Sequence, residues 1–185
     1  MSLRVIAGSA GGRRLIAPKG TARPTTDRLK EALFASLGRH RIDHAQVLDL
    51  YAGSGALAIE ALSRGAALAV LVDHDRAAEV AIRANLETTG FADVARFQRS
   101  TVHAFLTAPA PEAPFDLVFL DPPYDTSTVD VAAALAALAA GGLVAAGATV
   151  VMERPKHGER LPLPEGWGVE KERVYGDTLL VVANA

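Results

Sequence analysis

Cysteine is absent from the 185 residues of the chain. Disulfides, thiolate metal ligands and thiol nucleophiles are therefore excluded. The chain has five histidines, His40, His44, His74, His103 and His157. Their spacing is not that of a metal site, so we expect surface or packing roles for all five and no bound metal.

Aromatic residues and long apolar runs are also scarce. Aromatics make up 5% of a chain that is half hydrophobic, which predicts one compact unit with a core of small and branched aliphatic side chains. The longest apolar stretch, residues 129–143, is mostly alanine and falls short of the roughly 18–20 residues of a membrane span. Residues 1–8 lack the apolar core of a signal peptide. We therefore expect a cytoplasmic protein without membrane contact.

Charge is unevenly distributed along the sequence. Residues 1–41 hold nine Lys and Arg against two acidic residues, a net charge of +7, whereas the remainder has a net charge of −9. A basic segment on an acidic body indicates a surface for a polyanion such as a nucleic acid. An ordinary solvated arm would have the same composition.

The first part of the chain predicts a small extension. Two short β-like pieces, 4–7 and 14–17, flank a glycine-rich turn, which favours a hairpin. Apolar residues then recur at helical spacing from Leu29 to Leu37, and Gly38 ends the segment. Thr25 or Thr26 could cap that helix. We place a basic N-terminal extension at residues 1–41.

From residue 46 the pattern changes to alternating strands and helices, which predicts an α/β fold with a mostly parallel sheet in a second unit, residues 42–185. The last two strands favour a closing antiparallel pair. Expected strands are 47–51, 67–72, 95–98, 115–120, 149–153, 168–174 and 178–182, and expected helices are 56–64, 76–89, 102–106 and an alanine-rich one from 129.

The first motif is Asp49-Leu50-Tyr51-Ala52-Gly53-Ser54-Gly55-Ala56, between a predicted strand and a predicted helix. Gly53 and Gly55 allow a tight turn and a close approach of backbone to a ligand. The glycine spacing alone would also suit a dinucleotide. A carboxylate at Asp49 would repel a pyrophosphate and attract the ammonium of a bound amino acid. The alternative is a purely structural turn with a solvated Asp49.

The second motif is Asp73 at the end of the next strand. A carboxylate at this point can accept hydrogen bonds from both hydroxyls of an adenosyl ribose. Because NAD and S-adenosylmethionine both carry such a ribose, Asp73 indicates a nucleoside ligand without choosing between them. Asp75, two residues further on, is expected to cap the following helix.

The third motif, Asp121-Pro122-Pro123-Tyr124, follows an apolar strand. Two prolines stiffen the loop and remove backbone donors. The Asp121 carboxylate and the Pro122 carbonyl can accept both N–H groups of an exocyclic amine, and Tyr124 offers a ring on which a flipped base stacks. This pattern predicts methylation of a base amino group, because the sulfonium donor is already activated and the protein needs only to align the nucleophile. A plain proline loop is the simpler alternative.

The head Arg23-Pro24-Thr25-Thr26-Asp27-Arg28, together with the glycine loop and Asp121–Tyr124, resembles the RsmD family of bacterial 16S ribosomal RNA guanine-N2 methyltransferases. The resemblance covers nearly the whole chain. It implies a class I methyltransferase fold, Rossmann-like with seven strands, and a β-hairpin and helix extension that helps to hold RNA. It also implies S-adenosylmethionine as donor and 16S ribosomal RNA in the 30S subunit or its assembly intermediate as acceptor. We expect a monomer.

The resemblance and the motifs together assign the site residues. Catalytic roles go to Asp121, Pro122, Pro123 and Tyr124; cofactor contacts go to Asp49, Ala52, Gly53, Ser54, Gly55, Asp73, Thr101, Thr25 and Thr26; RNA contacts go to Arg4, Arg13, Arg14, Arg23 and Arg28. The acidic residue that relatives carry beside the adenine is replaced by Ser100-Thr101-Val102, and Thr101 is the substitute.

Three alternatives stay open on the sequence alone. An adenine-N6 methyltransferase would share the Asp-Pro-Pro-Tyr motif, although the chain has no separate domain for reading a DNA sequence. A non-catalytic module that binds S-adenosylmethionine or RNA would not need this motif intact. A dinucleotide oxidoreductase would require NAD binding. The absence of cysteine excludes methylation at C5 of a pyrimidine, which requires a thiol that attacks the ring.

Overall fold

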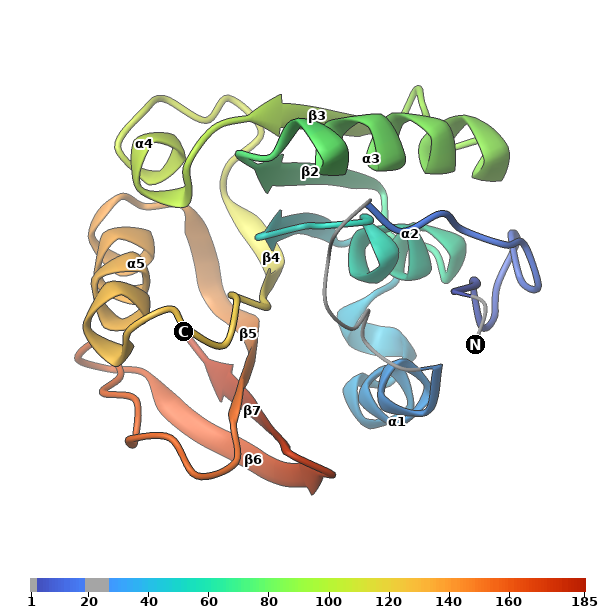
Figure 1. The fold of residues 1–185 in the computed structure, drawn as a ribbon. Coiled ribbons are helices and arrows are strands. Elements are labelled where there is room, and N and C mark those ends of the chain that lie inside the picture. Colours follow the sequence, from blue (N-terminus) through green and yellow to red (C-terminus); the bar gives the residue numbers. More distant parts are fainter. Residues whose placement is uncertain (1–2, 19–26) are drawn as a thin grey trace.

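The computed structural model describes residues 3–18 and 27–185. A seven-stranded sheet lies between two helical layers (Figure 1). The strands are β1 (Gln46–Leu50), β2 (Leu68–Asp73), β3 (Ala95–Arg99), β4 (Phe115–Leu120), β5 (Val144–Pro155), β6 (Gly168–Tyr175) and β7 (Thr178–Asn184). The helices are α1 (Asp27–Leu37), η1 (Arg39–Arg41, a 3-10 turn), α2 (Ala56–Ser63), α3 (Arg76–Thr89), α4 (Val102–Leu106) and α5 (Thr128–Ala140).

The sheet has the strand order β3-β2-β1-β4-β5-β7-β6. Strands β1 to β5 pair in parallel, and β7 is antiparallel to both β5 and β6. The predicted α/β class and its closing antiparallel pair are confirmed. Leu50 pairs with Val72 on one side and Leu120 on the other. The carboxyl ends of β1, β2 and β4 therefore meet at one edge, where open α/β sheets bind ligands.

Alternate residues of the central strands face two apolar clusters. In β4, Leu117 and Phe119 pack with α1, α2 and α3, whereas Val118 and Leu120 pack with α4 and α5. The Phe34 ring of α1 lies 5.8 Å from that of Phe119, centroid to centroid. Both faces of the central strands are thus buried, as the apolar runs of β1 and β4 predict.

The N-terminal segment 3–18 is a looser hairpin than the sequence predicted. Its two pieces pair through an antiparallel bridge between Arg4 and Arg14. The amides of Ile6 and Ala7 instead donate to the carboxylate of Glu60 on α2. Regular pairing is limited because this helix takes up the donors that a longer ladder would use. The division of the chain at residue 41 stays a prediction.

Most boundaries lie within two residues of those predicted, and two of the differences bear on the site and the sheet. Tyr51 was expected in the first strand but lies beyond it with φ 62°, because the turn toward α2 begins there. Strand β5 starts five residues earlier than predicted, at Val144. The register shifts between the pairs Phe115–Val144 and Leu117–Thr149, so the small residues 145–148 bulge out, and such residues give little strand signal. No helix in the described part of the chain is long and apolar enough to cross a bilayer.

Candidate active site

The glycine loop joins β1 to α2 through three left-handed residues, Tyr51, Gly53 and Gly55. The Ala52 amide donates to the Val72 carbonyl at 3.0 Å, which fixes the loop against β2. A Cβ on Gly55 would lie 2.8 Å from a methyl of Leu71, so both backbone conformation and space require glycine there. A Cβ on Gly53 would meet no atom nearer than 3.9 Å, so the surface of the loop at Gly53 is open to a ligand.

Asp49 lies beneath this loop and is buried. Its Oδ2 accepts the Ala58 amide at 3.1 Å, in the first turn of α2. The pKa of the Asp49 carboxyl is raised to about 8, mainly by burial; the hydrogen bond from Ala58 acts against this rise, and the negative charges of Asp121 and Asp73 add to it. At neutral pH a carboxyl with this pKa is mostly protonated, and a cation such as an ammonium close to it favours the charged form.

Asp73 holds the same loop from β2. Its Oδ2 accepts the Gly53 amide at 2.8 Å, and its Oδ1 accepts the Asp75 amide at 2.9 Å. Both oxygens keep lone pairs for a second donor, as a ribose would require. Asp75 caps α3 by accepting the Ala77 amide at 2.8 Å, as expected from the sequence.

A cavity of about 350 Å³ opens beside Asp73, between the β2 and β3 ends and helices α4 and α5. Its lining residues are Tyr51, Asp73, His74, Ser100, Thr101, Val102, His103, Leu106, Thr126, Asp130, Ala133, Ala134 and Ala137. Asp73 and Thr101, both predicted cofactor residues, therefore share one cavity wall. The Thr101 hydroxyl oxygen accepts the Ala104 amide at 3.2 Å and caps α4, so its proton is available to a ligand acceptor.

Several residues of this wall were not predicted. His74 and His103 are exposed, as expected, but their place in the cavity wall was not predicted. Tyr51 lines it too, and burial raises the pKa of its phenol, with a further contribution from the negative charge of Asp130. The position of His74 directly after Asp73 was the available signal, whereas Asp130 reaches the cavity only because α5 packs beside α4.

The Asp121–Tyr124 loop leaves the end of β4, next to β1. Pro122 is buried, and the Thr126 amide donates to the Pro123 carbonyl at 2.9 Å, which closes a turn. Tyr124 is 54% exposed, and its phenol oxygen lies 2.9 Å from the hydroxyl oxygen of Thr178 on β7. Tyr124 is thus more than half exposed while its hydroxyl is held, which suits stacking of a planar group.

Arg154 on β5 supports the chain that follows this loop. Its guanidinium donates to the Thr126 carbonyl at 3.4 and 3.5 Å and to the Thr128 hydroxyl at 3.4 Å. Its buried Nε has no acceptor within the described ranges. Burial also lowers the pKa of the guanidinium. These bonds are longer than usual protein hydrogen bonds and therefore weak.

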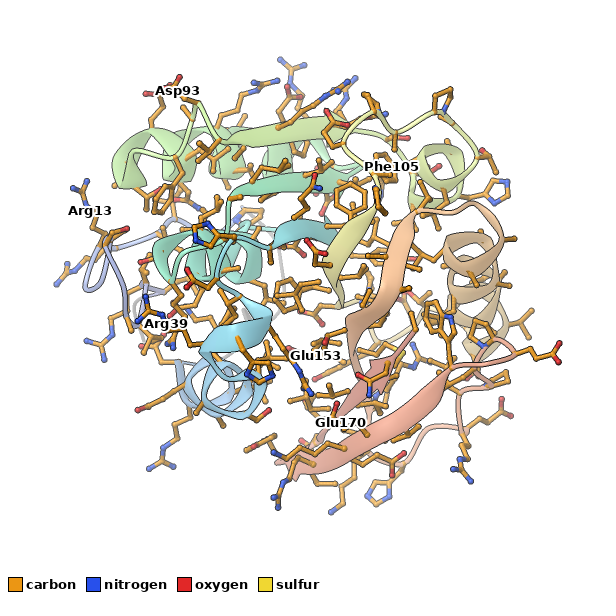
Figure 2. All side chains as sticks on the ribbon, turned by 180° about the vertical axis from the view of Figure 1, so that it is seen from behind. Arg13, Arg39, Asp93, Phe105, Glu153 and Glu170 are labelled. Atoms are coloured by element: carbon orange, nitrogen blue, oxygen red, sulfur yellow. The ribbon has the colours of Figure 1, made fainter. Side chains whose placement is uncertain are left out.

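Glu153, the residue before Arg154, lies beside Asp121. Leu120 pairs with Met152, so the next residues of the two strands, Asp121 and Glu153, are neighbours. Glu153 pairs with Leu180, whose side chain belongs to the apolar cluster that also contains Phe119. Glu153 is buried and lies on β5, near the centre of the view in Figure 2. Two carboxylates thus each follow a residue of the last β4–β5 pair.

The predicted RNA-binding arginines are spread over the extension. Arg4 pairs with Asp27 at 3.0 Å, Arg13 donates to the Thr88 carbonyl at the end of α3, and Arg14 and Arg28 are exposed. Figure 2 shows Arg13 at the margin of the molecule, on the extension. The predicted residues Arg23, Thr25 and Thr26 lie outside the described residues.

Polar side chains in the described ranges form no group of three or more that could hold a metal ion. The cavity and the Asp121–Tyr124 loop lie at the same edge of the sheet, and Thr126, two residues after the loop, lines the cavity. The geometry therefore brings together the predicted cofactor residues 49–55 and Asp73 and places the predicted base-binding loop beside them.

The chain is similar to known proteins over its whole length. A family model described as "Conserved hypothetical protein 95" matches residues 3–184. The "Ribosomal RNA small subunit methyltransferase D" of Escherichia coli K12 is 38% identical over 94% of this chain and 85% of that protein. The protein of the same name from Haemophilus influenzae Rd is 34% identical over 94% of this chain and 89% of that protein. The solved structure of the Escherichia coli protein yhhF is 36% identical with a TM-score of 0.87, covering 100% of this chain and 98% of that one.

Proposed function

The chain belongs to the RsmD family, whose model spans residues 3–184, and on this premise we propose that it methylates the N2 amine of a guanine in 16S ribosomal RNA. The methyl donor is S-adenosylmethionine. The observation that carries this proposal is the Asp121–Tyr124 loop, which leaves β4 beside the glycine loop of β1. The 30S subunit or its assembly intermediate is the proposed substrate, and the enzyme acts as a monomer in the cytoplasm.

The residues around the cavity fit this cofactor. The open surface over Gly53 accommodates its amino-acid portion, Asp73 is placed to accept from the ribose hydroxyls, and the cavity with Thr101 suits the adenine. Asp49 would be ionised by the nearby ammonium. When bound, the cofactor supplies a methyl group activated by its sulfonium.

The protein's own contribution is alignment of the amine. Asp121 and the Pro122 carbonyl accept the two N–H groups, which turns the nitrogen lone pair out of conjugation with the ring and toward the methyl group. Tyr124, held by Thr178, stacks on the base, worth about 1–3 kcal/mol. A carboxylate oxygen of Asp121 then accepts the proton that the amine loses and passes it to solvent.

Glu153 favours guanine over adenine. Guanine presents an N1–H donor beside its N2 amine, whereas adenine presents an acceptor, N1, beside its N6 amine. A carboxylate on the strand next to Asp121 can accept from the guanine N1–H but would repel the adenine N1. This pair of adjacent carboxylates supports N2 of guanine as the target.

The test is transfer of labelled methyl groups to 30S particles that lack the modification, to naked 16S ribosomal RNA and to DNA. We expect label in N2-methylguanine of the RNA. Asp121→Ala should lower the labelling rate about 100-fold or more while S-adenosylhomocysteine still binds. Asp125→Ala, an exposed carboxylate in the same loop, is the matched control. Label in N6-methyladenine, or a rate unaffected by Asp121→Ala, would contradict the proposal.

A further inference from the structure

Asn85 connects the extension to the glycine loop. It lies on α3 and is 1% exposed. Its Nδ2 donates to the carbonyls of Ile16 and Ser54, both at 2.9 Å. Its Oδ1 accepts the Ile16 amide at 2.8 Å. One side chain thus pairs with both backbone groups of Ile16 and with the residue between Gly53 and Gly55.

The amide of Asn85 has little freedom to change partners. Its two N–H donors are both used, and the side chain is buried, so a shift of either Ile16 or Ser54 leaves a polar group unsatisfied in an apolar environment. Such a group costs about 1–3 kcal/mol. The extension and the loop therefore lose their separate freedom to move.

A second set of contacts joins the extension to α2, the helix that the glycine loop begins. The Glu60 carboxylate is fully buried and accepts the amides of Ile6 at 2.7 Å and Ala7 at 3.1 Å. Arg64 donates to the same carboxylate at 2.7 Å. The Ala10 amide donates to the Ser63 hydroxyl at 3.0 Å. The extension is thus attached at two places. Asn85 joins it to the glycine loop, and Glu60 joins it to helix α2.

We propose that Asn85 is a positioning residue that couples cofactor binding at the glycine loop to RNA binding by the basic extension. The part of this inference that concerns RNA rests on the proposed function. A cofactor that orders residues 53–55 fixes Ser54. Through the hydrogen bonds of the Asn85 amide, this also fixes Ile16. RNA that binds the extension afterwards then loses less conformational entropy. Because binding coupling is reciprocal, RNA must raise the affinity for the cofactor by the same factor.

The first measurement is the dissociation constant of S-adenosylhomocysteine with and without saturating, unmodified 16S ribosomal RNA transcript. In the wild type we expect RNA to tighten binding about 5-fold or more, with the same factor when the two ligands are exchanged. Asn85→Leu, which keeps the side-chain volume and removes all three hydrogen bonds, should reduce the factor to below about 2-fold. Thr89→Val is the matched control, because it removes a buried hydroxyl of α3 that bonds within the helix.

The second measurement uses the wild-type protein without RNA. S-adenosylhomocysteine should slow hydrogen exchange of the Ile16 amide, which donates to Asn85, and leave unchanged the Gly158 amide, which donates to the Pro155 carbonyl outside the extension. This measurement does not depend on whether Asn85→Leu folds.

The outcomes separate the two proposals. Equal cofactor affinity with and without RNA, or unchanged exchange at Ile16, would overturn the coupling even if methyl transfer to RNA is robust. Slowed exchange at Ile16 in a protein that transfers no methyl group to RNA would support the coupling and contradict the proposed function. If RNA tightens S-adenosylhomocysteine binding by the same factor in Asn85→Leu as in the wild type, Asn85 does not carry the coupling.

Discussion

The phenol oxygen of Tyr124 lies 2.9 Å from the hydroxyl oxygen of Thr178, which joins the Asp121–Tyr124 loop to β7, 54 residues further along the chain. Thr178 begins β7 and pairs with Pro155 on β5 and Tyr175 on β6. The closing antiparallel pair therefore also supports Tyr124, the side chain that we propose stacks on the target base.

Removing the Thr178 hydroxyl should loosen this ring. We expect Thr178→Val to lower kcat/KM for methyl transfer about 2- to 10-fold, the value of one hydrogen bond, with cofactor affinity unchanged. Tyr124→Phe should have the same effect, and the double variant should be no worse than either single variant. Thr88→Val removes an exposed hydroxyl bonded within α3 and is the control. Additive losses in the double variant would mean that the two hydroxyls act independently.

Variants of Asp73 and Asp75 should show separate effects, one on cofactor binding and the other on helix capping. Asp73 accepts the Gly53 amide, so Asp73→Asn should weaken S-adenosylhomocysteine binding about 10- to 100-fold by calorimetry. Asp75 accepts only within the start of α3, so Asp75→Ala should lower the free energy of unfolding by about 0.5–2 kcal/mol with nearly unchanged cofactor affinity. The assignment of Asp73 to the ribose is wrong if both variants bind alike.

Asp49 should make stability depend on pH. Burial raises its pKa from 3.8 to about 8, so between these values the folded protein keeps a proton that the unfolded chain loses. The contribution of Asp49 to the free energy of unfolding must therefore fall as pH rises through this window, by up to about 1.4 kcal/mol per pH unit. Urea unfolding of Asp49→Asn between about pH 5 and 8 should show a weaker decline than the wild type. Equal declines would show that Asp49 ionises normally in the folded protein.

The same carboxyl should link cofactor binding to pH. If the cofactor ammonium ionises Asp49, binding releases a proton, and affinity should increase with pH between about 6 and 8. Titration of the wild type and Asp49→Asn with S-adenosylhomocysteine measures this linkage. An increase that persists in Asp49→Asn would have to come from another group.

The basic extension should give RNA binding its salt dependence. Removing one side chain that neutralises a phosphate lowers the slope of log K against log salt by about 0.7–0.9, so Arg13→Gln with Arg14→Gln should lower it by about 1–2. Lys171→Gln with Arg173→Gln, on the edge strand β6, changes the net charge equally and is the control. Equal slopes for the two double variants would indicate that RNA responds to the overall charge alone.

Periodicity and motif position were sufficient where one segment determines the outcome. Helices α3 and α4 and strand β4 have the predicted bounds, because their apolar spacing and the caps Asp75 and Thr101 are local signals. The glycine loop lies at the carboxyl end of β1, as a strand followed by Gly53 and Gly55 requires. Local chemistry also predicted that Asp73 would end the neighbouring strand.

Relationships that depend on strand order or helix packing were not predicted. Glu153 lies beside Asp121 because β5 pairs with β4, and nothing within residues 144–155 indicates that partner. Asp130 and His103 reach one cavity because α4 packs on α5. The role of Asn85 was not predicted, because a single asparagine in an amphipathic helix is usually solvent-exposed. Its contacts with Ile16 and Ser54 follow only from the tertiary structure.

The attachment of the extension also has a consequence for the order in which the protein is made. Residues 6 to 16 leave the ribosome before their partners, which follow 53 to 75 residues later, at Glu60, Ser63, Asn85 and Thr88. Long-range contacts of this kind form late, after the elements that they join. The part of the basic extension that holds Arg13 and Arg14 must therefore stay undocked during synthesis until α3 has emerged.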